Sequence, residues 1–133
     1  MHALTLEQRI ELTRGVMAIL DHWAVPAAAQ IRLLALPDAT KPRSLHRYRQ
    51  DTPLPEEPEI LERIEHLVGI ADALRTSYPR NASMDAQWLN TTNVRFDNRT
   101  PLEVMVEDGL DGVIAVRVLL DCAYDWHISG SRR

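Results

Sequence analysis

The chain has 133 residues, of which 45% are hydrophobic and 26% are charged, proportions that are ordinary for a globular protein. This length suits one domain or two very small ones. Eight prolines against five glycines favour compact helices with abrupt ends over a glycine-rich β protein. The net charge of −4 lies entirely in residues 58–133, which carry eight Lys/Arg and twelve Asp/Glu, whereas residues 1–57 carry seven of each. This asymmetry predicts two parts with different partners.

The sequence gives no sign of a membrane protein. The longest apolar run, residues 113–120, is interrupted by Arg117 and is too short to span a bilayer. The N-terminus lacks the basic start and the apolar core of a signal peptide. The single cysteine, Cys122, fits a reducing compartment and is expected to be a buried structural residue. We therefore expect a cytoplasmic protein.

The first part of the chain predicts three helices. Apolar residues at helical spacing predict a helix over residues 5–22, and a second begins at Pro26 and ends before Pro37. A third begins near Pro42 and must end before three closely spaced prolines. This proline cluster, residues 53–58, is the clearest boundary in the chain. It predicts a helix-turn-helix-like domain over residues 1–57 and a second domain over residues 58–133.

The second part also reads as helical. One buried face predicts a long helix from about residue 60 to Pro79, and Ser83 can begin a short helix that runs through Leu89. After a loop, the sequence from Thr100 to Glu103 is a capping box with proline at the first helical position. Gly109 ends that helix, and a last helix is expected from Gly112 to about Asp125.

A β-strand is the alternative for VIAVRVLLD, residues 113–121, because β-branched residues favour strands. Helix is preferred, since Val113, Val116 and Leu120 follow helical spacing and a lone strand would have no partner. The sequence therefore predicts an all-α fold.

A basic stretch with no acidic residue, KPRSLHRYR, lies in the third predicted helix. On a helical wheel, one side of that helix packs through Leu45 and Tyr48, and the other presents cationic and amide groups. In a recognition helix, Arg can pair with guanine and Gln with adenine, while further cations contact phosphate. The alternative is a solvated basic face. The candidate DNA-binding residues are Lys41, Arg43, His46, Arg47, Arg49 and Gln50, with Lys41 and Arg49 expected to be free for phosphate.

The sequence offers little to an enzyme. It contains no nucleotide-binding glycine motif, no metal-protease motif and no paired cysteines, and its five histidines are scattered. We therefore expect no catalytic residues, no metal site and no cofactor.

Aromatic and cationic residues gather at the C-terminus. Interfaces concentrate their binding energy in such residues, so this segment is a candidate docking element. The alternative is an aromatic cover for the core followed by a frayed tail. The candidate residues are Tyr124, Trp126, His127, Ile128, Ser129, Arg132 and Arg133.

The second part of the chain resembles the C-terminal toxin-binding domain of the Xre/MbcA/ParS class of bacterial antitoxins. That pattern has an Ala-rich apolar helix, Trp-Leu, a loop with Asn, Ser/Thr-Pro-Leu, a Gly, and a closing helix with spaced Val and Leu. The family loop often carries a Pro-Asn pair and a Gly pair, where this chain has Thr92-Asn93 and Phe96-Asp97-Asn98-Arg99. The resemblance covers roughly residues 58–126 and is closest to the ParS type. The matching residues are Ala71, Ala73, Trp88, Leu89, Asn93, Thr100, Pro101, Leu102, Gly109, Val113, Val116 and Leu120.

The resemblance implies a function. Such antitoxins pair with RES-domain toxins, which consume NAD or transfer its ADP-ribose to a protein, and they cover the toxin's NAD-binding cleft with their C-terminal region. It adds Trp88 and Asn93 to the candidate toxin contacts. It also implies a homodimer within a hetero-oligomeric toxin–antitoxin complex, and repression of its own operon through the N-terminal part. The alternative is a DNA-binding regulator whose C-terminal domain only dimerises.

Overall fold

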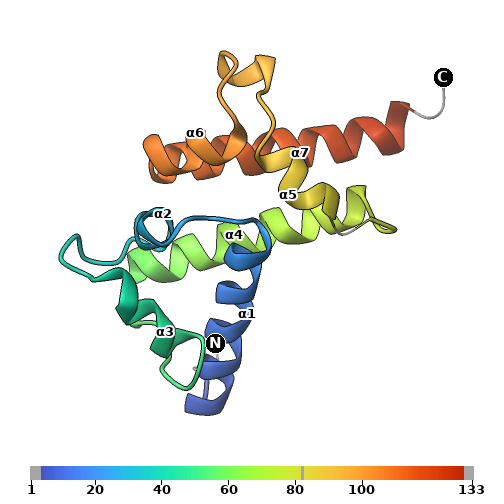
Figure 1. The fold of residues 1–133 in the computed structure, drawn as a ribbon. Coiled ribbons are helices and arrows are strands. Elements are labelled where there is room, and N and C mark those ends of the chain that lie inside the picture. The colour runs from blue at the N-terminus through green and yellow to red at the C-terminus, as the bar shows by residue number, and fades with distance from the viewer. Residues whose placement is uncertain (1–3, 82, 131–133) are drawn as a thin grey trace. The chain divides into compact units, whose positions relative to one another are not determined.

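The computed structural model describes residues 4–81 and 83–130, and for residues 123–130 it describes the backbone alone. The fold is all-α: the only β-type pairing in these residues is an isolated bridge between Asn93 and Arg99. The chain divides into two compact units, Met1–Ile64 and Glu65–Arg133, and the division falls inside one helix (Figure 1). That residues 57 and 58 separate two domains of different function stays a prediction.

The first unit opens with helix α1, Leu6–His22, as the periodicity predicts. Thr5 caps it: the Thr5 hydroxyl accepts a hydrogen bond from the backbone N–H of Gln8, and the Gln8 side chain accepts one from the backbone N–H of Thr5. Its buried side chains fall on one stripe and are Thr13, Val16, Met17 and Leu20.

Three short elements follow α1 within this unit. Helix α2 spans Ala27–Leu33, a 3₁₀ turn η1 spans Pro42–Ser44, and helix α3 spans Leu45–Tyr48. Ala24 and Ala35 adopt left-handed backbone just after α1 and α2, with φ of 60° and 58°. Both helices therefore end sharply, ahead of the prolines that mark these ends in the sequence. The core of the unit is aliphatic and aromatic, and its most deeply buried side chains include Met17, Leu20, Trp23, Leu33, Leu34 and Leu45.

The proline-rich stretch before α4 has no regular structure, yet α1 holds it in place. The Thr13 hydroxyl, which is buried, accepts a hydrogen bond of 2.9 Å from the Leu54 backbone N–H. The Arg9 guanidinium donates to the Leu54 carbonyl at 3.3 Å and pairs with the Glu56 carboxylate at 3.0 Å. The proline-rich segment, which looks like a linker in the sequence, is thus held against α1 by hydrogen bonds and an ion pair.

Helix α4, Pro58–Ser77, begins in the first unit and ends in the second. Its most buried residues are Ile60, Ile64, Leu67, Ile70 and Leu74. Val68 and Ala71, which the sequence places on the same stripe, are only half-buried. The sequence therefore identifies the helix correctly and misjudges the centre of its buried face by a fraction of a turn.

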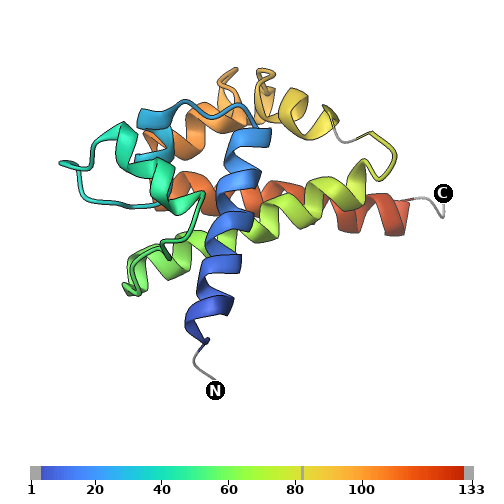
Figure 2. The same cartoon turned by 60° about the horizontal axis from the view of Figure 1, so that its bottom comes forward.

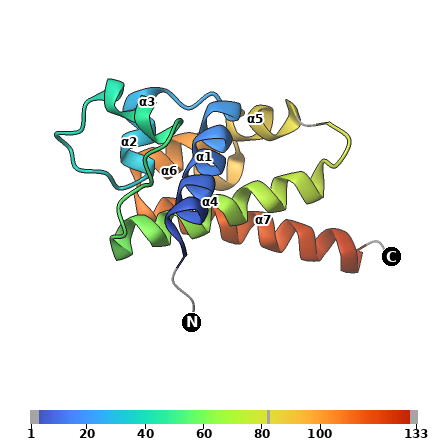
Figure 3. The same ribbon diagram turned by 90° about the horizontal axis from the view of Figure 1, so that it is seen from below.

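The second unit continues with α5, Ser83–Leu89, a 3₁₀ turn η2, Val94–Phe96, α6, Pro101–Glu107, and α7, Leu110–Gly130. The views in Figures 2 and 3 both show α7 as one long continuous helix. The apolar run that could have been a strand is therefore helix. The predicted start at Gly112 is two residues late and the predicted end near Asp125 is five residues early.

Helices α6 and α7 pack against each other in this unit. Gly109, with φ of 66°, reverses the chain between them in a conformation that favours glycine. A Cβ atom at Gly112 would lie 2.1 Å from the backbone carbonyl oxygen of Val104. Only glycine allows the two backbones to approach this closely. The apolar side chains buried on this pair are Leu102, Val104, Met105, Val113, Val116 and Leu120.

Candidate functional site

The side chains of the candidate docking element at the C-terminus lie outside the described part of the structure. The backbone of residues 124–129 belongs to the last turns of α7. The side chains of Tyr124, Trp126, His127, Ile128 and Ser129 are outside the described residues, and so are Arg132 and Arg133. Their role in docking stays a prediction.

The loop between α5 and α6 has a defined geometry instead of being irregular. The Asn93 backbone N–H donates to the Arg99 carbonyl, and the Asn98 backbone N–H donates to the Asn93 carbonyl, both at 3.0 Å. The Asn93 side-chain oxygen accepts from the Arg95 backbone N–H at 2.9 Å and so caps η2. Residues 93–99 therefore form a closed, internally hydrogen-bonded turn, which stands out from the helices of its unit in Figure 1.

The closure of this turn requires unusual backbone at two adjacent residues. Asp97 and Asn98 adopt left-handed conformations, with φ of 56° and 65°. Besides glycine, Asn and Asp are the residues that tolerate this region best. The residue types at these two positions therefore suit the backbone that the turn requires.

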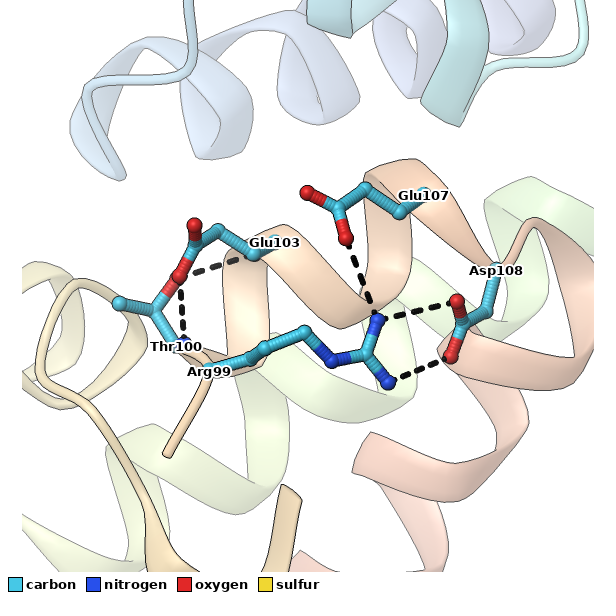
Figure 4. A network of polar contacts seen from close by, with 5 residues as sticks. All are labelled: Arg99, Thr100, Glu103, Glu107 and Asp108. Atoms are coloured by element: carbon cyan, nitrogen blue, oxygen red, sulfur yellow. Dashed lines mark hydrogen bonds and ion pairs between the residues drawn. The ribbon is translucent and has the colours of Figure 1, made fainter. Parts of the chain in front are cut away.

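An ion-pair fork fastens the C-terminal end of the turn to α6 (Figure 4). The Arg99 guanidinium donates two hydrogen bonds to the two carboxylate oxygens of Asp108, each at 3.0 Å, and a third to Glu107 at 3.3 Å. These hydrogen bonds raise the pKa of Arg99 above its ordinary value, and the bond from Arg99 lowers the pKa of Asp108. The two-pronged geometry fixes orientation as well as distance.

The next residue begins α6 with the capping box that the sequence predicts, also drawn in Figure 4. The Thr100 backbone N–H donates to the Glu103 carboxylate at 2.8 Å, and the Glu103 backbone N–H donates to the Thr100 hydroxyl at 3.0 Å. The first of these bonds is the main cause that lowers the pKa of Glu103. Pro101, at the first helical position, is buried. Two consecutive residues at the entry to α6, Arg99 and Thr100, are thus held by contacts to the helix.

The two candidates near the loop, Trp88 and Asn93, are both half-buried. Trp88 is half-buried in α5, next to the fully buried Leu89. Asn93 is half-buried, and its side-chain oxygen is used inside the turn. Sequence reasoning missed Val94, whose side chain is 80% exposed near the start of the turn, and the exposed Arg95 beside it. The one signal for them was an apolar residue among polar neighbours.

The basic face of the first unit is shorter than a full recognition helix. It consists of η1 and the four-residue α3, preceded by an eight-residue connection from α2, whereas the turn of the helix-turn-helix motif has three or four residues. The Gln50 amide lies 3.1 Å from the His46 ring, and the Arg47 guanidinium lies 5.4 Å from the centre of the Tyr48 ring. The exposed candidates are Lys41, Arg43, His46, Arg47 and Gln50.

Arg49, expected to be free for phosphate, is engaged in the fold. Its guanidinium donates two hydrogen bonds of 2.8 Å to Asp21 and one of 2.9 Å to the side-chain oxygen of Gln30. The buried Gln30 in turn donates to Asp21 at 2.9 Å and to the Val25 carbonyl at 3.0 Å. The bond from Arg49 is the largest cause that lowers the pKa of Asp21. This network ties the end of α3 to α1 and α2.

Among the residues that the structure describes, no group of three or more His, Cys, Asp or Glu side chains could hold a metal ion, and no helix is long and apolar enough to cross a membrane. Cys122 is exposed, so the expectation that it is buried is wrong. The register of α7 explains this, because Cys122 lies about 200° around the helix from the buried Leu120.

Part of the second unit is similar to a known family. Residues 80–122 match the family model described as the antitoxin Xre/MbcA/ParS C-terminal toxin-binding domain. A search of curated proteins found no match to the chain. Residues 80–122 are therefore similar to an antitoxin toxin-binding domain. The matched residues run from just before α5 into α7 and include the whole of the fixed turn, its Arg99 fork and the Thr100 cap.

Proposed function

We propose that this protein is the antitoxin of a type II toxin–antitoxin system and that it neutralises a RES-domain toxin, as the ParS type does. The observation that carries the proposal is the match of residues 80–122 to a toxin-binding domain. The family domain implies a regulator that acts by binding and not by catalysis. A cytoplasmic location and a homodimer within the toxin complex belong to the same proposal.

The mechanism we propose is steric. The C-terminal region covers the toxin's NAD-binding cleft and keeps the substrate out. The structure supports this proposal by giving the C-terminal region a firm base: α7 is one helix from Leu110 to Gly130, and its first half is packed against α6. A segment carried on a formed helix loses less conformational entropy on binding than a disordered tail. Arg132, Arg133 or the terminal carboxylate would fill polar subsites of the cleft, and Trp126 would contact its rim.

The test is co-expression in bacteria with the RES-domain toxin encoded beside this protein. The full-length chain is expected to restore growth and cellular NAD, and a chain cut after Tyr124 is expected to restore neither. The cut form must keep its helical content and its partner-free stability for the comparison to count. Full rescue by the cut form would contradict the steric mechanism, and no rescue by the full-length chain would contradict the antitoxin function.

A second function, DNA binding by the first unit, rests on a separate observation. Lys41, Arg43, Arg47 and Gln50 are exposed on η1, α3 and the residues around them. Such a surface could bind the protein's own operator, or could make the chain a transcriptional regulator whose second unit only dimerises. The double variant R43A/R47A is expected to lose operator binding and to keep toxin rescue. The opposite result would show that this face serves the toxin.

A further inference from the structure

We propose that Val94 and Arg95, two exposed neighbours in the turn of residues 93–99 that are called its tip below, are a second contact with the toxin, separate from the C-terminal segment. This inference rests on the proposed function and names a further part of the same interface. The partner is a folded toxin surface that offers an apolar socket for Val94 and a carboxylate for Arg95.

The exposure of Val94 is the first observation. Its side chain is 80% exposed, more than any other large hydrophobic side chain that the structure describes, the next being Leu6 at 60%. A single exposed apolar residue needs no explanation by itself. Here, however, it lies at the start of η2, in a turn that hydrogen bonds hold closed, and this turn lies within the residues that match the toxin-binding family model.

The fixing of the turn is the second observation. Four separate features hold it: the Asn93–Arg99 bridge, the Asn93 cap on η2, the Arg99 fork to Asp108, and the Thr100 capping box. A turn of this length needs no such restraint merely to connect α5 with α6. Restraint of a protruding segment in one conformation lowers the entropy lost on binding, as expected for a contact surface.

The charge at the tip is the third observation. The Arg95 side chain is exposed, and it has no hydrogen-bond or ion-pair partner within the described ranges 4–81 and 83–122. Arg99, four residues later, is in contrast fully used by Asp108 and Glu107. The tip therefore presents one available guanidinium beside one exposed apolar side chain, a pairing that suits an anchor flanked by a charge contact.

The experiment measures the affinity and the association rate of the purified full-length chain for the RES-domain toxin. V94D is expected to weaken binding by about tenfold or more, because it removes an apolar contact and places a charge in its socket. L6D is the matched control, since it makes the same kind of change at an exposed apolar residue outside the matched domain. Both variants should melt at the wild-type temperature, because both side chains are exposed.

R95Q tests the charge contact. It is expected to slow association and to reduce the dependence of the association rate on salt, because a contact between exposed charges steers the encounter of two proteins. A packing role alone would not change the salt dependence. Three results would each overturn the proposal. The first is an unchanged affinity of V94D for the toxin, and the second is an equal loss of affinity in V94D and L6D. The third is an association rate of R95Q that depends on salt as the wild-type rate does.

The wild-type measurement separates this inference from the function on which it rests. If the wild-type chain binds the toxin and V94D binds equally well, the tip contact is wrong and the antitoxin function stands. If the wild-type chain does not bind the toxin at all, the proposed function fails first.

Discussion

Asn98 shows how a single residue sets the shape of the turn. Its φ of 65° lies in a region where side chains with a branched Cβ are strongly disfavoured, and its backbone N–H bonds to Asn93. We expect N98G to range from unchanged to about 1 kcal/mol more stable, and N98V to be less stable by about 1–3 kcal/mol. Urea unfolding measures both. Equal losses in N98G and N98V would mean that the Asn side chain matters and the backbone conformation does not.

Asp21 couples the stability of the first unit to pH. Arg49 lowers its pKa below the ordinary value of 3.8, so the folded state binds the proton less readily than the unfolded state. The stabilisation is therefore complete above about pH 4–5 and is lost as the pH falls through the lower pKa of the folded state. We expect D21N to lower the free energy of unfolding by about 1 kcal/mol at pH 7. The effect is modest because the Arg49–Asp21 pair is partly exposed.

The measurement is urea unfolding of the wild-type chain and D21N at pH 7 and at pH 3. The difference in free energy of unfolding between the two chains should be smaller at pH 3 than at pH 7, because the wild-type carboxylate begins to take up its proton. An undiminished difference at pH 3 would show that Asp21 acts through shape and not through charge.

At the scale of elements, Gly112 decides how closely α6 and α7 can pack. An alanine in a helix interior is ordinarily about 1 kcal/mol more stable than glycine. At Gly112 the added Cβ would meet the Val104 carbonyl oxygen at 2.1 Å, which is backbone and cannot move alone. We expect G112A to destabilise the chain by about 2–3 kcal/mol.

Gly69 provides the matched control on the same structural unit. A Cβ there would meet the Arg117 guanidinium at 2.6 Å, but that group is the end of a flexible side chain and can move away. G69A is therefore expected to change the free energy of unfolding by less than about 1 kcal/mol. Chemical denaturation of both variants checks this, and a G112A chain as stable as G69A would contradict the close approach of the two helices.

The elements themselves were largely predictable, because their signals are local. Helix periodicity, Pro26, Pro42 and the Thr100 capping box predict helices that the structure confirms. The choice of helix over strand for residues 113–121 was also correct, since the sequence offered no second strand. The first residue of α7 could not be predicted, because neither Gly109 nor Leu110 has a capping side chain that would mark the start of the helix.

The contacts that shape the candidate sites were not predictable, because they join residues distant in sequence. Arg49 seemed free on a helical wheel that assumed one helix to Gln50. Helix α3 in fact ends at Tyr48, and Arg49 reaches Asp21, 28 residues earlier. The Arg99 fork likewise spans nine residues and depends on the turn at Asp97 and Asn98. Neither contact leaves a signal in the local sequence around its arginine.

At the scale of the whole molecule, the two units differ in the chemistry they expose. The first presents a cluster of cations on and around α3, while the second holds the fixed turn within the residues that match a toxin-binding domain. This division supports an account in which one part binds the toxin and the other is available to DNA. The uneven net charge of the sequence is consistent with it.

The most direct test of the central claim is NAD consumption by the purified RES-domain toxin with increasing amounts of the full-length chain. The account predicts that consumption stops at a fixed molar ratio and that a high concentration of NAD slows the onset of inhibition, because both compete for one cleft. Binding to the toxin without any loss of NAD consumption, or inhibition that is insensitive to NAD, would contradict coverage of the NAD-binding cleft.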